Sequence, residues 1–177
     1  MTTYQKADKN LYSKYTKELQ TLYLETFTNG ISAQHISQKD AETYLDSTFK
    51  NGFGIFVFSN NNLIASLLAT PISYDDERPD EIIRIFNDED SLYIAEVLVS
   101  KNYRGQGIGN KIIQYFENHL DPNIKNIFLR VWQENKVAVN LYKKSGFTIC
   151  GEISQEKYKP ETKEKFIMHK NYMVKSI

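Results

Sequence analysis

The sequence predicts a single α+β domain built around one mixed β-sheet. Segments whose apolar residues recur every three to four positions, as in amphipathic helices, are interleaved with short β-branched and aromatic runs typical of strands. In the middle of the chain strands and helices alternate, which favours parallel neighbours, whereas runs joined by short turns favour antiparallel pairs. The 177 residues suffice for one sizeable core, so we expect residues 1–177 to form one domain.

The first part of the chain predicts two helices and then a hairpin. Apolar residues recur at helical spacing across 9–27. Ser37 is typical of a helix N-cap, and the helix that follows is expected to end at the Asn-Gly pair at 51–52. The β-branched and aromatic runs 54–58 and 63–72 then flank an asparagine-rich turn, which predicts two antiparallel strands.

The second part predicts four more strands and two more helices. A loop with glycines at alternating positions joins the first of these strands to the first helix, and a glycine follows the second helix as a natural end. The strands are predicted at 91–100, 127–132, 147–153 and 165–169, and the helices at 108–120 and 136–145.

Residues 75–90 interrupt what would otherwise be a simple turn between two strands. They carry eight acidic residues against two arginines. We expect a solvated surface excursion with a short packed element around Ile82–Phe86. An acidic rim that attracts a cationic substrate is the functional alternative.

Charge and composition argue against several classes of protein. The 22 basic and 22 acidic residues balance, so neither a nucleic acid nor an anionic membrane is an expected partner. The single cysteine excludes an internal disulfide framework and Cys-cluster metal sites, and the three histidines lie far apart, so we expect no metal. No signal-like or membrane-length apolar run is present, which leads us to expect a cytoplasmic protein.

The glycine-rich loop has the features of a phosphate-binding site. Its three glycines offer bare backbone, the following helix points its free N–H groups at the same place, and Arg104 and Lys111 add positive charge at the rim. The spacing differs from a dinucleotide fingerprint, because Asn110 stands where its last glycine should be, and no Gly-Lys-Ser/Thr follows as in a P-loop. A dinucleotide site is therefore the weaker alternative.

These residues resemble the glycine loop of the GNAT superfamily of acyl-CoA-dependent N-acyltransferases. Arg104-x-x-Gly107-x-Gly109 matches its (Gln/Arg)-x-x-Gly-x-(Gly/Ala) pattern, and 135–147 resembles its N-x-x-A-x-x-x-Y-x-x-x-G-F segment. The resemblance covers nearly the whole chain. It implies a GNAT-like mixed, mostly antiparallel central sheet of about six to seven strands, with helices on both faces. It also implies acetyl-CoA as co-substrate and a primary amine as acceptor, reacting by direct attack in a ternary complex.

The resemblance also implies where the cofactor lies. In the family, the strand before the glycine loop carries a bulge and splays from its parallel neighbour, so that its backbone pairs with the pantetheine arm. Asn135 and Tyr142 lie two helical turns apart on one helix face, which leaves a groove for that arm. The expected cofactor-binding residues are Val97, Leu98, Val99, Arg104, Gly105, Gln106, Gly107, Ile108, Gly109, Asn110, Asn135, Ala138 and Tyr142.

Two side chains are expected to move protons. By resemblance, the hydroxyl of Tyr142 protonates the departing thiolate, since a phenol pKa lies close to that of a thiol. Glu96 is the only carboxylate on its strand and is the expected general base, with a purely structural role as the alternative. Alternation places Glu96 opposite Val97, but a bulge would change that face. Tyr93 is a further candidate, for a water relay.

Several acceptors are compatible with the sequence. The acidic segment and the Trp132-x-x-Asn135 region favour a cationic small molecule such as a polyamine. A protein or peptide N-terminus or a lysine side chain is the main alternative, and a non-catalytic acyl-CoA-binding sensor is an alternative of another class. A homodimer is common among such folds, although no residue here argues for one.

Overall fold

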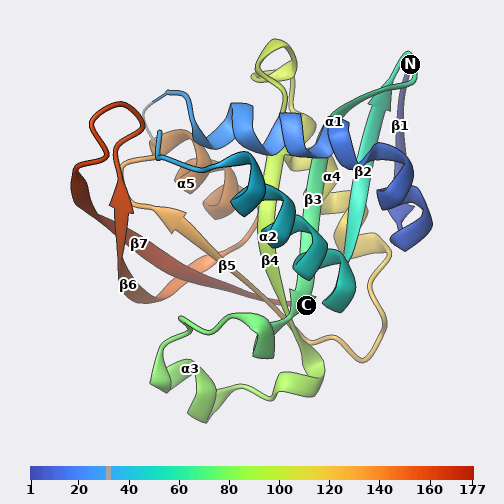
Figure 1. Cartoon of the computed structure of the whole chain (residues 1–177). Coiled ribbons are helices and arrows are strands. Elements are labelled where there is room, and N and C mark those ends of the chain that lie inside the picture. The colour runs from blue at the N-terminus through green and yellow to red at the C-terminus, as the bar shows by residue number, and fades with distance from the viewer. Residues whose placement is uncertain (31–32) are drawn as a thin grey trace.

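A computed structural model describes residues 1–30 and 33–177, which fold around one seven-stranded sheet (Figure 1). The strand order is β1-β2-β3-β4-β5-β7-β6, and among these described strands only the β4–β5 pair is parallel. The strands are β1 (Thr2–Ala7), β2 (Phe53–Ser59), β3 (Asn62–Pro71), β4 (Ser91–Val99), β5 (Asn126–Trp132), β6 (Thr148–Tyr158) and β7 (Lys165–Ser176). The helices are α1 (Lys9–Phe27), α2 (Gln38–Asn51), α3 (Asp80–Ile85), α4 (Ile108–Asn118) and α5 (Lys136–Lys144).

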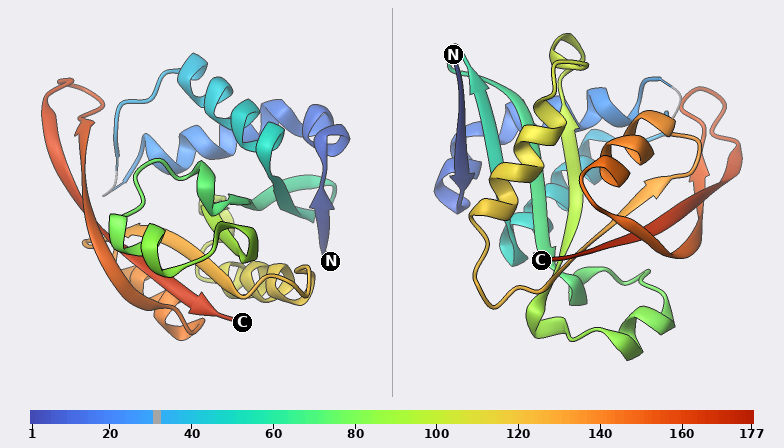
Figure 2. Two further views of the ribbon diagram at one scale, coloured as in Figure 1. Left: turned by 90° about the horizontal axis from the view of Figure 1, so that it is seen from below. Right: turned by 180° about the vertical axis from the view of Figure 1, so that it is seen from behind.

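Helices cover both faces of the sheet, which confirms the predicted architecture. Helices α1 and α2 lie across one face, and α4 and α5 lie on the other (Figures 1 and 2). Each buries its apolar stripe, α1 through residues such as Leu19 and Leu22, and α4 through Ile112 and Phe116. Ser37 caps α2 as predicted, because its hydroxyl accepts a hydrogen bond from the backbone N–H of Asp40 at 3.1 Å.

The first strand, β1, is not predicted by the sequence. Residues Thr2–Ala7 pair antiparallel with β2 at the edge of the sheet. Only Ala7 is buried in this strand, so it lacks the apolar alternation by which strands are recognised. Backbone pairing holds it, together with Tyr4, whose ring stacks on that of Tyr115 in α4 at 5.4 Å between centroids. The total of seven strands remains within the expected range.

Strand β4 separates from its parallel neighbour halfway along its length. The two strands pair from Ser91 to Ile94 on β4, although β4 continues to Val99. On its other side the register with β3 shifts at this point, so that Ala95 is an extra residue, a β-bulge. Figure 1 shows β5 leaning away from β4 beyond the bulge. The result is a wedge-shaped opening in the middle of the sheet.

The last two strands are longer than the sequence predicts. They extend as a hairpin to Tyr158 and Ser176, and Figure 2 shows it curling away from the plane of the other strands. The polar residues of the β6 extension, among them Gln155 and Lys157, hide its strand pattern, because they line a pocket rather than an apolar core. The β7 extension differs, since its Tyr172 and Met173 are buried in the core.

The acidic segment is more ordered than an exposed excursion. Asp75 is 3% exposed, accepts a hydrogen bond from the hydroxyl of Tyr172 at 2.8 Å and pairs with Arg130 at 3.4 Å. Arg78 pairs with Asp88. The expected packed element exists as α3, in which Ile82 is buried, whereas Ile83 and Ile85 are exposed. Within the part of the chain that the structure describes, no helix is long and apolar enough to cross a membrane.

The Tyr172–Asp75 hydrogen bond should contribute measurably to stability. Replacing Tyr172 by Phe removes the donor and leaves a buried carboxylate with one partner fewer, which should cost about 1–3 kcal/mol in the free energy of unfolding. Urea denaturation measures this loss. Tyr158→Phe is the matched control, since Tyr158 is 41% exposed and should change stability by less than about 0.5 kcal/mol. Equal stability of both variants would contradict this role.

Candidate functional site

A pocket of about 580 Å³ lies where β4 and β5 separate. Its walls come from helices α1 and α2 with residues 34–36 between them, from β4, β5 and α5, and from the β6–β7 hairpin. The polar and aromatic side chains that line it include Tyr44, Glu96, Trp132, Tyr142, Lys157 and Lys170. Residues predicted from two distant motifs, Glu96 on β4 and Tyr142 on α5, therefore meet in one cavity.

The glycine loop leaves the N-terminus of α4 without a side-chain cap. Gly107 is the N-cap, and its φ of 76° is in the left-handed region that favours glycine. The other helices of more than eight residues are capped by the side chains of Asp8, Ser37 and Asn135. The first N–H groups of α4 thus remain available for an anion. A Cβ built on Gly105 or Gly107 would meet nothing within 4 Å, so the backbone lies open to a ligand.

The other loop residues shape this backbone. The Nε of Arg104 donates to the carbonyl of Val99 at 2.9 Å, and the side-chain amide of Gln106 donates to the carbonyl of Asn102 at 3.1 Å. The following residues attach the loop to the fold. Ile108 is buried in the core, Gly109 lies where a Cβ would come within 3.0 Å of Leu141, and Asn110 accepts from Ser145 at 3.4 Å.

Helix α5 brings three predicted residues to the pocket. Asn135 caps the helix, because its Oδ1 accepts from the backbone N–H of Ala138 at 3.2 Å. Ala138 and Tyr142 line the same cavity. Burial raises the pKa of the Tyr142 phenol well above its ordinary value, and the nearby charge of Glu96 raises it further. The phenol is therefore protonated at neutral pH.

The backbone of β4 beyond the bulge is unpaired on the side of β5. The three residues predicted there alternate in direction. Val97 lines the pocket and Val99 packs with the core beneath α4, whereas Leu98 is fully buried against α1 and α2. Ala95 also packs with the α1–α2 core. The bulge consequently directs both Ala95 and Glu96 toward these helices, and Glu96 remains opposite Val97 as alternation predicts.

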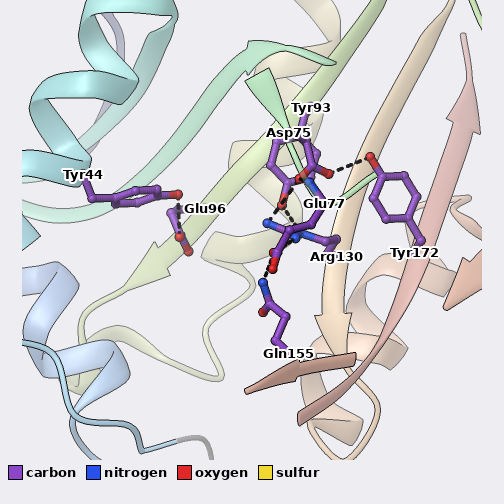
Figure 3. A network of polar contacts seen from close by, with 8 residues as sticks. All are labelled: Tyr44, Asp75, Glu77, Tyr93, Glu96, Arg130, Gln155 and Tyr172. Carbon is purple, nitrogen blue, oxygen red and sulfur yellow. Dashed lines mark hydrogen bonds and ion pairs between the residues drawn. The ribbon is translucent and has the colours of Figure 1, made fainter. Parts of the chain in front are cut away.

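The carboxylate of Glu96 is held by a tyrosine that the sequence analysis missed. The hydroxyl of Tyr44, on α2, donates to Oε1 of Glu96 at 2.9 Å (Figure 3). Burial raises the pKa of Glu96 to about 7, and the hydrogen bond from Tyr44 and the charge of Lys170 limit this rise. A carboxyl group with such a pKa can take up or release a proton near neutral pH.

A network around Arg130 forms the floor beside Glu96 (Figure 3). The Nε of Arg130 donates to the hydroxyl oxygen of Tyr93 at 2.7 Å, and its other nitrogens pair with Asp75 and Glu77. The side-chain amide of Gln155 donates to the same Glu77. Tyr93, considered above for a water relay, is thus bound to Arg130. Two acidic residues of the 75–90 segment are used to neutralise one buried arginine.

The residues that the sequence analysis missed are separated from Glu96 by long stretches of chain. Tyr44 lies 52 positions earlier, and Lys157 and Lys170 follow on the last hairpin. None belongs to a motif, and only the folded sheet brings them together. No group of three or more His, Cys, Asp or Glu side chains that could hold a metal ion occurs among the residues described by the structure.

Comparison with known proteins agrees with this geometry. The chain is 30% identical over 83 residues to the "Probable spermine N(1)-acetyltransferase" of Bacillus subtilis subsp. natto, a match that covers 44% of this chain and 55% of that protein. It is 44% identical over 57 residues to the thialysine N-epsilon-acetyltransferase of Sus scrofa, covering 32% of this chain and 34% of that one. The chain thus spans about half the length of the first relative and about a third of the length of the second.

A structural match extends over almost the entire chain. It is to a Salmonella typhimurium structure that contains acetyl-CoA as its cofactor, with a TM-score of 0.70, 12% identity and coverage of 99% of this chain and 94% of that one. The sequence model of the acetyltransferase (GNAT) family matches residues 16–147. The protein therefore belongs to the GNAT family of acetyltransferases.

Proposed function

We propose that the protein transfers an acetyl group from acetyl-CoA to the primary amine of a small molecule. One observation carries this proposal: the opening between β4 and β5 brings Glu96 and Tyr142 into the same pocket, beside an unpaired strand edge that leads to an uncapped helix. Family membership supports acetyl-CoA as the donor. A carboxylate and a phenol in one pocket can accept and donate the two protons that amide formation moves.

The described residues fit coenzyme A along one continuous path. The open backbone at Gly105 and Gly107, with the free N–H groups of α4, suits the pyrophosphate. Beyond Ile94 the β4 backbone has free hydrogen-bonding groups that suit the amides of a pantetheine arm, as an added strand would. Asn135 and Ala138 border the pocket at the end of this path.

Glu96 and Tyr142 then divide the proton transfers. The amine nitrogen attacks the thioester carbonyl carbon, and its proton passes to Glu96, directly or through water. The carbon–sulfur bond breaks, and Tyr142 gives its proton to the leaving thiolate. The two steps are coupled, because the charge of Glu96 raises the pKa of Tyr142. When Glu96 takes up the proton of the amine this charge disappears, and the phenol becomes a stronger acid when the thiolate leaves.

The acceptor is proposed as a small molecule because the pocket is walled by the last hairpin and by residues 34–36 before α2. The relatives named for spermine and thialysine support a small amine. The acidic segment gives less support to a polyamine than its composition suggests. Asp75 and Glu77 are paired with Arg130, and Asp88 is paired with Arg78.

Release of free thiol tests the proposed activity directly. Purified protein, acetyl-CoA and a panel of primary amines should yield coenzyme A at a rate that depends on the amine, followed with a thiol-reactive chromogen. Binding of acetyl-CoA by calorimetry is measured in parallel. Tight binding without thiol release from any amine would overturn the catalytic proposal and indicate a non-catalytic acyl-CoA-binding protein.

Replacing Tyr142 by Phe should slow the chemical step more than it weakens cofactor binding. Loss of the general acid is expected to lower kcat on the order of 100-fold. The phenyl ring keeps its packing against Phe147, so the acetyl-CoA Kd should change little. Steady-state kinetics and calorimetry give the two values. A Tyr142→Phe enzyme with the turnover of wild type would remove this residue as the acid.

The rate should depend on pH through Glu96. The carboxyl group accepts a proton only when ionised, and its pKa is raised to about 7, so kcat/KM should fall as the pH drops below about 7. Glu96→Gln should lower the rate and abolish this limb of the pH profile. Tyr142→Phe is the matched control, since it should be slow but keep the limb. An unchanged limb in Glu96→Gln would exclude Glu96 as the base.

A side chain at Gly107 should weaken cofactor binding. Gly107→Ala strains a backbone with φ of 76° and places a methyl group at the open end of α4, which should raise the coenzyme A Kd about ten-fold. Gly30→Ala is the matched control, because Gly30 has a φ of 81° and equally open surroundings. Both variants should lose similar stability in urea. Equal coenzyme A affinity in the two would contradict the assignment of the pyrophosphate site.

A further inference from the structure

Two lysines of the last hairpin face the pocket without a partner. Lys157 on β6 and Lys170 on β7 line the cavity. Across the described ranges 1–30 and 33–177, neither ammonium group has an ion pair or a hydrogen bond. Neighbouring lysines behave differently: Lys159 pairs with Glu164, Lys165 with Glu156 and Lys175 with Glu117. Among the lysines of strands β6 and β7, all within the described chain, the two that line the pocket are thus the ones without a counterion.

The register of the strands places both lysines on the pocket face of the hairpin. Lys170 lies opposite Trp132 on β5 and opposite Ile153 on β6. Because alternate residues of a strand share a face, Lys157 lies on the same face as Ile153. Trp132 also lines the cavity. Both ammonium groups therefore project from the β6–β7 hairpin toward the part of the pocket that would hold the amine substrate.

No carboxylate of the described residues lies within ion-pair distance of these ammonium groups, although the charge of Glu96 across the pocket acts on both of them. Burial lowers the pKa of Lys170 to about 8, with the charges of Arg130 and Lys157 adding to the effect. The charge of Glu77 also acts on both lysines, but this carboxylate is already bound to Arg130. Half-buried ammonium groups without a counterion are unfavourable. A negatively charged ligand group would remove this deficit, and a second positive charge would increase it.

We propose that the acceptor carries an anionic group as well as its amine, as an amino acid does, and that Lys157 and Lys170 bind this group. The inference rests on the proposed function and selects the acceptor class. The amine lies toward Glu96 and Tyr142, and the anionic group lies toward the hairpin. A carboxylate accepts hydrogen bonds from both ammonium groups. A polyamine would bring further cations to the same wall.

Matched acceptors test the sign of the charge that the pocket prefers. Lysine and 1,5-diaminopentane differ by one carboxylate, and 6-aminohexanoate carries the carboxylate without the α-amino group. Lysine and 6-aminohexanoate, which carry the carboxylate, should each have a kcat/KM about ten-fold or more above that of 1,5-diaminopentane. Ethanolamine phosphate against ethanolamine tests a phosphate in the same way, and a preference for it would also support an anionic group. Equal or faster acetylation of 1,5-diaminopentane and spermine would overturn the proposal.

Variants at the two lysines locate the effect. Lys170→Gln and Lys157→Gln should each raise the KM for the anionic acceptor about ten-fold while leaving the KM for 1,5-diaminopentane unchanged or lower. Lys165→Gln is the matched control on β7, the strand of Lys170, since Lys165 is exposed and paired with Glu156. Thermal unfolding checks that all three variants are folded. An equal loss for anionic and cationic acceptors would indicate a structural role and contradict the proposal.

Binding measurements decide the inference even without turnover. Calorimetry with glutarate and with 1,5-diaminopentane, in the presence of coenzyme A, compares the two charges on the complete chain. Glutarate should bind more tightly to wild type and lose this advantage in Lys170→Gln. If no amine is acetylated, the proposed function fails, but this preference would still support an anion site. A preference for the diamine, or no binding of glutarate, would overturn it.

Discussion

The separation of β4 from β5 is the constraint on which the rest of the site depends. The two strands pair only as far as Ile94 and Leu129, and the bulge at Ala95 turns the following residues away from this partner. A flat, fully paired sheet would isolate α5 on one face from α2 on the other. Because the sheet is open here, Tyr142 of α5 lines the same cavity as Tyr44 of α2. The same opening frees a strand edge that can bind a ligand backbone.

A second constraint is electrostatic and involves the acidic segment. Arg130 lies on β5 beside the opening, and a buried guanidinium without partners would be costly. Asp75 and Glu77 neutralise it, and Tyr172 and Gln155 fix these two carboxylates in turn. The segment between β3 and β4 thereby holds Arg130, Tyr93 and Gln155, which do line the pocket. Part of its acidity, which on composition alone suggested a cationic substrate, is therefore neutralised within the fold.

The sequence predicts the parts of the site that depend on local chemistry. The glycine loop needs left-handed backbone at Gly107, and a helix end needs a cap such as Ser37 or Asn135, so these positions leave short-range patterns. The alternating strands and helices between β4 and α5 were predicted from local patterns of the same kind. Edge strand β1 and the outer half of β6 were not, because backbone pairing and a polar pocket face replace the apolar alternation that identifies strands. In β7 the buried residues 171–173 are consecutive, so the unpredicted part of this strand lacks alternation as well.

The site residues that the sequence did not predict were missed for a different reason. Tyr44, Lys157 and Lys170 act through contacts with residues far along the chain, and their types are common on any helix or strand. Composition even pointed the other way, since eight acidic residues in one segment suggested a cationic acceptor. Only ion pairing in the folded chain shows which charges are neutralised and which remain free.

The free lysines also influence the catalytic carboxylate. Burial alone would raise the pKa of Glu96 further, and the charges of Lys170, Arg130 and Lys157 oppose this rise. An acceptor whose anionic group binds these lysines would partly screen them and make Glu96 a stronger base in the complex than in the free protein. Lys157 and Lys170 would thus select the amine substrate and, once it is bound, also change the basicity of Glu96. A cationic amine substrate would have the opposite effect and make Glu96 a weaker base. The pocket would therefore distinguish anionic from cationic substrates in the chemical step as well as in binding.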